Sequence, residues 1–192
     1  MPRAPRQTAP GGIYHVTARG NNKAALFVDD GDRHIFFELL ARVARRHGWL
    51  VLAHCLMTTH YHLVIQVPTD GLSAGICLLN GAYARKANKR HGRGGHLFHD
   101  RFRSVSIARQ EHLLEACRYV VLNPVRAGLC SSPEAWPWSS YRACAGIDLA
   151  PGFLADAELL GLFNRRADRA RRAYQAFVSE GHLSVPGTVP EV

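Results

Sequence analysis

The sequence lacks the features that mark membrane and secreted proteins. No stretch approaches the roughly 18 consecutive apolar residues that a membrane span needs, and the basic N-terminal stretch MPRAPRQTAPGG has no apolar segment of a secretory signal. The cysteines are odd in number and form no CxxC pair, which favours reduced thiols over disulfides or a zinc site: Cys55, Cys77, Cys117, Cys130 and Cys144. We therefore expect a cytoplasmic protein with no membrane association.

Acidic residues are also scarce. The chain has 15 Asp and Glu against 24 Lys and Arg, a formal net charge of +9. Because the guanidinium of arginine matches the oxygens of a phosphate, such a charge favours a nucleic-acid partner over a protein that is merely basic. The candidates for contacts to a nucleic-acid backbone, each of which could equally be a solvated surface charge, are Arg19, Arg85, Lys86, Lys89, Arg90, Arg93, Arg101 and Arg103.

The hydrophobic pattern predicts one compact α+β domain. Two-residue alternation indicates strands and the 3.6-residue period indicates helices. The predicted order is strand 13–19, helix 32–47, strands 49–57 and 60–67, helix 72–90, extended chain 96–107 and helix 110–122. This order fits a ferredoxin-like βαββαβ fold, with an antiparallel sheet, flanking helices and one added helix. Residues 155–180 are expected to be helical. The helix at 110–122 is expected to end at Asn123, because the residue before a proline avoids helical geometry.

Two histidines in the strand at 60–67 are candidate metal ligands. His60 and His62 are two residues apart, so their side chains share one face of the strand, about 6.6 Å from each other. Tyr61, Leu63, Ile65 and Val67 form a wholly apolar face on the other side of the strand. Both histidines would therefore lie near one end of the strand and away from the core. Two imidazoles at this spacing can bind one metal ion. Two polar residues facing solvent would give the same pattern.

The helix at 110–122 carries a tyrosine beside polar residues. Tyr119 and Asn123 are four residues apart and therefore project together from the helix. Tyr119 is a candidate nucleophile, and the amide oxygen of Asn123 could complete a metal site. Alternatively, the tyrosine packs over the helix edge and Asn123 caps the helix end.

Several ordered segments resemble one family. The HYH of residues 60–62 resembles the HUH motif of the HUH endonucleases. The single-tyrosine transposases of the IS200 type, and among them the REP-associated tyrosine transposases, are similar in four further segments: RGNNKAALF (19–27), HLFHDRFRS (96–104), RYVVLNPVRAGL (118–129) and WPWSSYR (136–142). The chain departs from the family in two places. Met57-Thr58-Thr59 precedes the first histidine where relatives usually have Pro-Asn or a similar pair, and His99-Asp100 replaces the usual Gln-Gly.

The resemblance implies a ferredoxin-like domain of the HUH endonuclease type over residues 11–146, after a flexible tail at 1–10. A C-terminal extension at 147–192, with one helix and a loose end, lies outside it. It further implies that Tyr119 is the nucleophile, that His60 and His62 bind a divalent metal (Mg²⁺ or Mn²⁺), and that Asn123 is a third ligand. The implied substrate is single-stranded or hairpin DNA, nicked and joined through a 5′-phosphotyrosine. The protein would be a monomer or a homodimer.

Two alternatives remain at this point. The chain could be a DNA-binding protein of the same fold that has lost cutting, or an unrelated ferredoxin-like RNA-binding module. The latter should expose aromatic residues on its sheet. Trp136 and Trp138 could stack on bases, but beside Pro137 we expect them to pack against the core.

Overall fold

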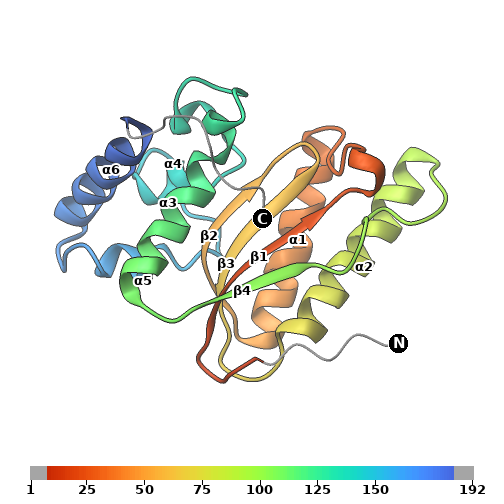
Figure 1. The fold of residues 1–192 in the computed structure, drawn as a ribbon, viewed down its shortest axis with the longest axis horizontal. Helices are drawn as coiled ribbons and strands as arrows, with labels where there is room; N and C mark the ends of the chain where they lie inside the picture. Colours follow the sequence, from red (N-terminus) through yellow and green to blue (C-terminus); the bar gives the residue numbers. More distant parts are fainter. Residues whose placement is uncertain (1–7, 184–192) are drawn as a thin grey trace.

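The structure, a computed structural model, describes residues 8–183. Its sheet contains four strands in the order β2-β3-β1-β4, and every neighbouring pair is antiparallel. The strands are β1 (Ile13–Arg19), β2 (Leu50–Leu56), β3 (His60–Gln66) and β4 (Arg103–Ile107). This strand order, with α1 (Asp30–His47) after β1 and α2 (Leu72–His91) after β3, confirms the ferredoxin-like α+β fold. Figure 1 shows the sheet between two groups of helices.

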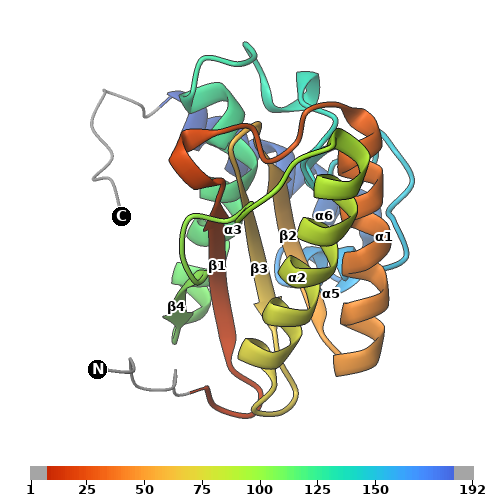
Figure 2. The same cartoon turned by 90° about the vertical axis from the view of Figure 1, so that its right-hand side faces the viewer.

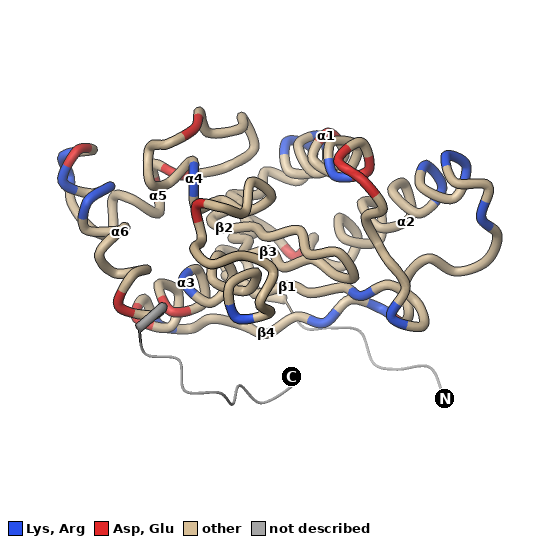
Figure 3. The backbone as a smooth tube through the Cα atoms, turned by 90° about the horizontal axis from the view of Figure 1, so that it is seen from above, with Lys and Arg blue, Asp and Glu red and all other residues tan. Residues whose placement is uncertain are grey.

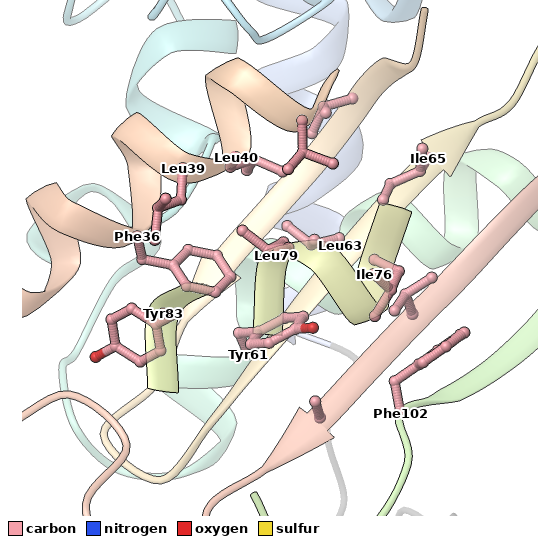
Figure 4. Close-up of a cluster of buried hydrophobic side chains, with 14 of the residues drawn as sticks. Phe36, Leu39, Leu40, Tyr61, Leu63, Ile65, Ile76, Leu79, Tyr83 and Phe102 are labelled. Carbon is pink, nitrogen blue, oxygen red and sulfur yellow. The ribbon is translucent and has the colours of Figure 1, made fainter. Parts of the chain in front are cut away.

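Helices α1 and α2 cover one face of the sheet. In Figure 2 they lie side by side in front of the strands. The predicted apolar side of β3 contacts them, because Tyr61, Leu63 and Ile65 are fully buried in the core that α1 and α2 share with the sheet. Figure 4 shows this cluster, in which the rings of Phe36, Tyr61 and Tyr83 meet. The alternation of apolar residues along β3 therefore identified this core correctly.

The opposite face of the sheet is covered by α3 (Gln110–Arg126), with the C-terminal helices beyond it (Figure 1). The remaining elements are η1 (Asn21–Lys23), η2 (Pro133–Ala135), α4 (Tyr141–Cys144), α5 (Asp156–Gly161) and α6 (Ala167–Leu183). The single helix expected in the C-terminal extension is therefore two helices, with residues 162–166 between them. The loose end expected after them and most of the tail at 1–10 fall outside the described residues.

Helix α3 does not end at Asn123 as predicted, but continues through Pro124 to Arg126. The proline cannot donate a backbone hydrogen bond, and its ring crowds the preceding turn. Burial offsets that cost, because Val121, Leu122 and Pro124 are all buried. The side-chain amide of Asn123 adds a hydrogen bond by donating to the Tyr119 carbonyl at 3.0 Å. Tertiary packing has therefore overridden the local preference of the residue before proline.

Candidate functional site

The candidate site lies on the face of the sheet that α3 covers, at the end where β3 begins and β1 finishes. His60 pairs with Arg19 of β1, and His62 pairs with Thr17. Directly opposed residues of antiparallel strands project from the same face, so both histidines share this face with β1 side chains. The expectation that this face lies away from the core is wrong: His62 is only 6% exposed, and His60 is half-buried.

Tyr119 of α3 lies over these histidines within the same chain. Its ring centroid is 5.8 Å from that of His62, and the two rings meet edge to face. The His60 and His62 rings are 5.0 Å apart. The structure thus brings the predicted nucleophile beside the predicted metal ligands, although they are more than 50 positions apart in the chain. The tyrosine is half-buried.

A third histidine, which the sequence reasoning missed, completes the cluster. His15 of β1 stacks on His62 with ring centroids 5.2 Å apart, and its Nε2 is 3.0 Å from Nδ1 of His62. Its ring also meets the edge of Tyr119 at 5.8 Å. The signal was present in IYHVTAR, where His15 alternates with Thr17 on the polar side of the strand. Only the pairing of β1 with β3 shows that this side faces the HYH segment.

Burial keeps these imidazoles neutral. It lowers the pKa of His15 to about 4, and burial together with the positive charge of Arg19 lowers that of His60 to about 4. Burial, followed by the neighbouring His15 and His60, holds the pKa of His62 well below its usual range. A neutral imidazole is the form that binds a metal ion, because it keeps a lone pair on one ring nitrogen. The cluster therefore has the protonation state that a metal site requires.

One ring nitrogen of His62 has no partner. Within residues 8–183, its buried Nε2 accepts or donates no hydrogen bond, and an unpaired buried polar atom is costly. A metal ion at Nε2 would remove this deficit. It would require the proton of His62 to reside on Nδ1, which then donates to Nε2 of His15. Ligand histidines commonly donate their second ring nitrogen to a neighbour in this way.

The side chain of Asn123 does not contact the two histidines through a hydrogen bond. Its amide nitrogen donates to the Tyr119 carbonyl, and it makes no hydrogen bond to His60 or His62. The described part of the chain contains no group of three or more His, Cys, Asp or Glu side chains arranged for a metal ion. Any ligands beyond the two histidines would therefore be of another kind, such as an amide oxygen, a phenol oxygen, water or a phosphate of the substrate.

The predicted basic residues fall into two groups. Arg19 and Arg103 lie on the face of the site, since Arg19 pairs with His60, and Thr17 lies between Arg103 and His62. The other group lies on α2 and in the segment between α2 and β4: Arg85, Lys86, Lys89, Arg90, Arg93 and Arg101. Figure 3 shows basic residues gathered at the end of α2. Among these, Arg90 already binds Asp29 and Asp32 at 2.7 Å each. A DNA phosphate would therefore have to compete with these two carboxylates for the Arg90 guanidinium.

Both tryptophans of the WPWSSYR segment pack against the core, as expected. The indole of Trp136 donates to the Leu56 carbonyl at 3.2 Å. Trp138 packs beside Phe37, and the guanidinium of Arg33 lies 5.4 Å above its ring. The same segment bonds to β2 through the carbonyl of Trp138 and the amide of Leu56, so it covers the edge of the sheet.

The fold and the site define a ferredoxin-like domain with a tyrosine and paired histidines on one face of its sheet. The sequence model of the family described as "Transposase IS200 like" matches residues 9–123, and the chain belongs to this family. Its members are enzymes that act on DNA. This finding confirms the resemblance recognised in the sequence. No helix in the described range is long and apolar enough to span a membrane.

Two relatives agree with this assignment. A protein of Haemophilus influenzae, assigned as a REP-associated tyrosine transposase, is 22% identical over 157 residues; the match covers 76% of this chain and 89% of that protein. Among solved structures, a REP-associated tyrosine transposase bound to a REP hairpin has 18% identity and a TM-score of 0.66. That alignment covers 81% of this chain and 92% of the other, and it supports the fold.

Proposed function

We propose that this protein nicks and rejoins single-stranded DNA through a covalent bond to Tyr119, with a divalent metal held by His60 and His62. The observation that carries the proposal is the placement of the Tyr119 ring 5.8 Å from His62, whose buried Nε2 has no hydrogen-bond partner among residues 8–183. A phenol nucleophile beside a vacant imidazole nitrogen provides the two parts that phosphoryl transfer requires, a nucleophile and a point of charge neutralisation.

The residues present fit a divalent metal ion. His60 and His62 would be its protein ligands, His15 would hold His62 in the required tautomer, and Asn123 is our candidate for a third ligand. When bound, Mg²⁺ or Mn²⁺ supplies a Lewis acid that neutralises charge on the phosphate. Imidazole ligands suit Mn²⁺ better than Mg²⁺. The strands β1 and β3 fix all three histidines, so the site is built on rigid elements.

The reaction is a transesterification. The phenol oxygen of Tyr119 forms a bond to the phosphorus while the bond from phosphorus to the 3′ oxygen breaks. The phenol loses its proton, and the departing 3′ oxygen takes one up. The products are a 5′-phosphotyrosine and a free 3′-hydroxyl. Because the energy of the phosphodiester is kept in the new ester, attack by a second 3′-hydroxyl reverses the step and joins two strands.

We infer that the substrate is a folded DNA end. The solved relative binds a REP hairpin, and the positive charge of this chain suits a DNA backbone. Arg19 and Arg103, on the face of the site, are the candidates for contacts near the cut, whereas Arg85, Lys86, Lys89, Arg93 and Arg101 would contact more distant phosphates. Binding should therefore weaken as salt concentration rises.

The RNA-binding alternative finds no support in the arrangement of the sheet. Such a module reads bases on aromatic residues of an open sheet face. Here α1 and α2 cover one face and α3 covers the other, and the aromatic side chains Tyr14 and Tyr61 are buried. The binding-only alternative differs from the enzyme in chemistry alone, so only an assay of cutting distinguishes them.

The test is a search for the covalent intermediate. A labelled library of single-stranded hairpin oligonucleotides is incubated with the protein and Mn²⁺, then resolved on a denaturing gel. We expect a shifted band that protease removes and that Tyr119→Phe abolishes. The matched control is Tyr14→Phe, because the Tyr14 phenol lies outside the site and accepts a hydrogen bond from the amide of Ala9. No shifted band across the library would favour the binding-only alternative. A band that survives in Tyr119→Phe would mean that another residue is the nucleophile, and activity that survives thorough chelation would refute the role of the metal.

A further inference from the structure

Arg126, in the last turn of α3, is a further cation beside the site that neither the sequence reasoning nor the mechanism above uses. It lies seven residues after Tyr119, two helical turns along the same face. Its guanidinium carbon is 5.1 Å from the centroid of the Tyr119 ring. The residue is half-buried. A charged side chain thus stacks directly on the proposed nucleophile.

The Arg126 guanidinium forms no direct ion pair within residues 8–183. Its Nε is buried without a hydrogen bond, and its guanidinium forms no ion pair or hydrogen bond with any residue in the range 8–183. Burial lowers the pKa of Arg126, whereas the Tyr119 phenol and the Glu115 carboxylate, which Arg118 already binds, act in the opposite direction. A partly buried guanidinium is costly unless an anion compensates it. The free protein therefore bears a cost at this position that an anionic ligand would relieve.

Arg118, on the same helix, shows what a structural arginine looks like in this protein. Its guanidinium also stacks on an aromatic ring, 4.3 Å from the centroid of Phe177. Unlike Arg126, it binds both carboxylate oxygens of Glu115, at 2.6 and 2.7 Å, and donates to the Phe177 carbonyl. The dipole of α3 would stabilise a cation near residue 126, but that effect does not require burial or an unpaired Nε.

We propose that Arg126 binds a non-bridging oxygen of the scissile phosphate while Tyr119 attacks it. This inference rests on the proposed function of Tyr119. The stacked guanidinium and the phenol would reach the same phosphate from the same face of α3. As the bond from Tyr119 to phosphorus forms and the bond to the 3′ oxygen breaks, negative charge grows on the non-bridging oxygens. Arg126 neutralises that charge by hydrogen bonding and stays protonated throughout, so it transfers no proton.

The main test compares two substrates at a single position. An oligonucleotide that the wild type converts to the adduct is made with either a phosphate or a neutral methylphosphonate at the cut. On the phosphate, Arg126→Gln should slow adduct formation by about 100-fold, the order seen when one transition-state donor is removed. Arg126→Lys, which keeps the charge but not the planar fork, should lose about 10-fold. Arg172→Gln, which removes an exposed arginine of α6 that pairs with Asp168, is the control and should stay within about threefold of the wild type.

The methylphosphonate distinguishes charge neutralisation from a structural role. It has no negative oxygen for Arg126 to neutralise, so the difference between the wild type and Arg126→Gln should shrink to less than about fivefold. A variant that was merely misfolded or had a displaced Tyr119 would stay slow on both substrates. A wild-type rate for Arg126→Gln on the phosphate, or an unchanged defect on the methylphosphonate, would overturn the proposal.

A binding measurement tests Arg126 even if no adduct forms. In the Tyr119→Phe background, the affinity for the hairpin oligonucleotides is measured over a range of salt concentrations. Removing one phosphate contact should lower the slope of log affinity against log salt by about one. An unchanged slope in Arg126→Gln would refute phosphate binding. A reduced slope together with no adduct from the wild type would support phosphate binding while refuting the proposed function.

Discussion

His54 should make the protein sensitive to acid. Its imidazole, on β2, is fully buried between the rings of Phe37 and Phe153, with centroids 4.9 and 5.5 Å away. Its Nδ1 has no hydrogen-bond partner among the described residues. Burial lowers the pKa of His54 to about 3, from 6.5 in the unfolded chain. As pH falls through 6.5, the unfolded chain takes up a proton that the folded protein cannot accept, so the free energy of unfolding decreases.

The size of this effect follows from linkage. With a pKa near 3 in the folded protein and 6.5 in the unfolded chain, His54 alone should remove about 2 kcal/mol of stability between pH 7.5 and pH 5. The loss should continue until the pH reaches about 3. His15, His60 and His62 also have lowered pKa values and contribute in the same direction. A variant at residue 54 is therefore needed to isolate its share.

The assay is urea unfolding of the wild type and of His54→Leu at pH 7.5 and pH 5, followed by tryptophan fluorescence. Leucine keeps an apolar side chain in the pocket and removes the titration. We expect the stability of the variant to fall by about 2 kcal/mol less than that of the wild type over this interval. His112→Leu, which removes an exposed imidazole from α3, is the control. Equal falls in the wild type and His54→Leu would refute the reasoning.

Two further predictions concern the proposed metal site and the contact between α1 and α2. His15→Ala should weaken Mn²⁺ binding by about 10- to 100-fold, because His62 loses the acceptor for its Nδ1 proton. A Mn²⁺ titration followed by electron paramagnetic resonance measures the affinity. His15→Gln, which keeps an acceptor oxygen, should recover part of it. An unchanged affinity in His15→Ala would contradict the assigned tautomer. Asp32→Asn should cost about 3 kcal/mol of stability in urea unfolding. The buried carboxylate of Asp32 accepts hydrogen bonds from Arg90 and His91, and a loss below about 1 kcal/mol would show that its burial cost cancels these bonds.

Periodicity was sufficient to locate β1 and β3, whereas β4 (Arg103–Ile107) was expected only as extended chain within 96–107. The alternation in IYHVTAR gave the bounds of β1, and HYHLVIQV located β3 to within one residue. It also showed which side of β3 carries His60 and His62. It could not show that α3 covers that side, because a two-residue period gives only the relative orientation of side chains. Strand pairing had the same limit, since His15 joins the site only through the register of β1 on β3.

Local rules failed where long-range packing decided the outcome. The rule for residues before proline ended α3 too early, because burial of Pro124 and its neighbours outweighs it. Charge counting placed Arg90 among the candidate DNA contacts, which stays a prediction, but it could not show that Arg90 binds Asp29 and Asp32 at the start of α1, 61 and 58 residues earlier in the chain. Arg126 was overlooked for the converse reason. Nothing in its sequence neighbourhood distinguishes a paired from an unpaired arginine, and only the contacts in the described part of the chain show that it forms no ion pair there.

The C-terminal segment packs against the helix that carries the proposed nucleophile, although it lies beyond the matched residues 9–123. Leu159, Tyr174 and Val178 are buried in the same core cluster as the α3 residues Cys117 and Val121. Arg118, the residue before Tyr119, donates to the Phe177 carbonyl on α6. Since α3 bears both Tyr119 and Arg126, the angle at which this helix crosses the sheet sets their distance from the histidines. Strands β1 and β3 therefore fix the positions of the histidines, whereas the position of Tyr119 depends on how α3 packs against α6.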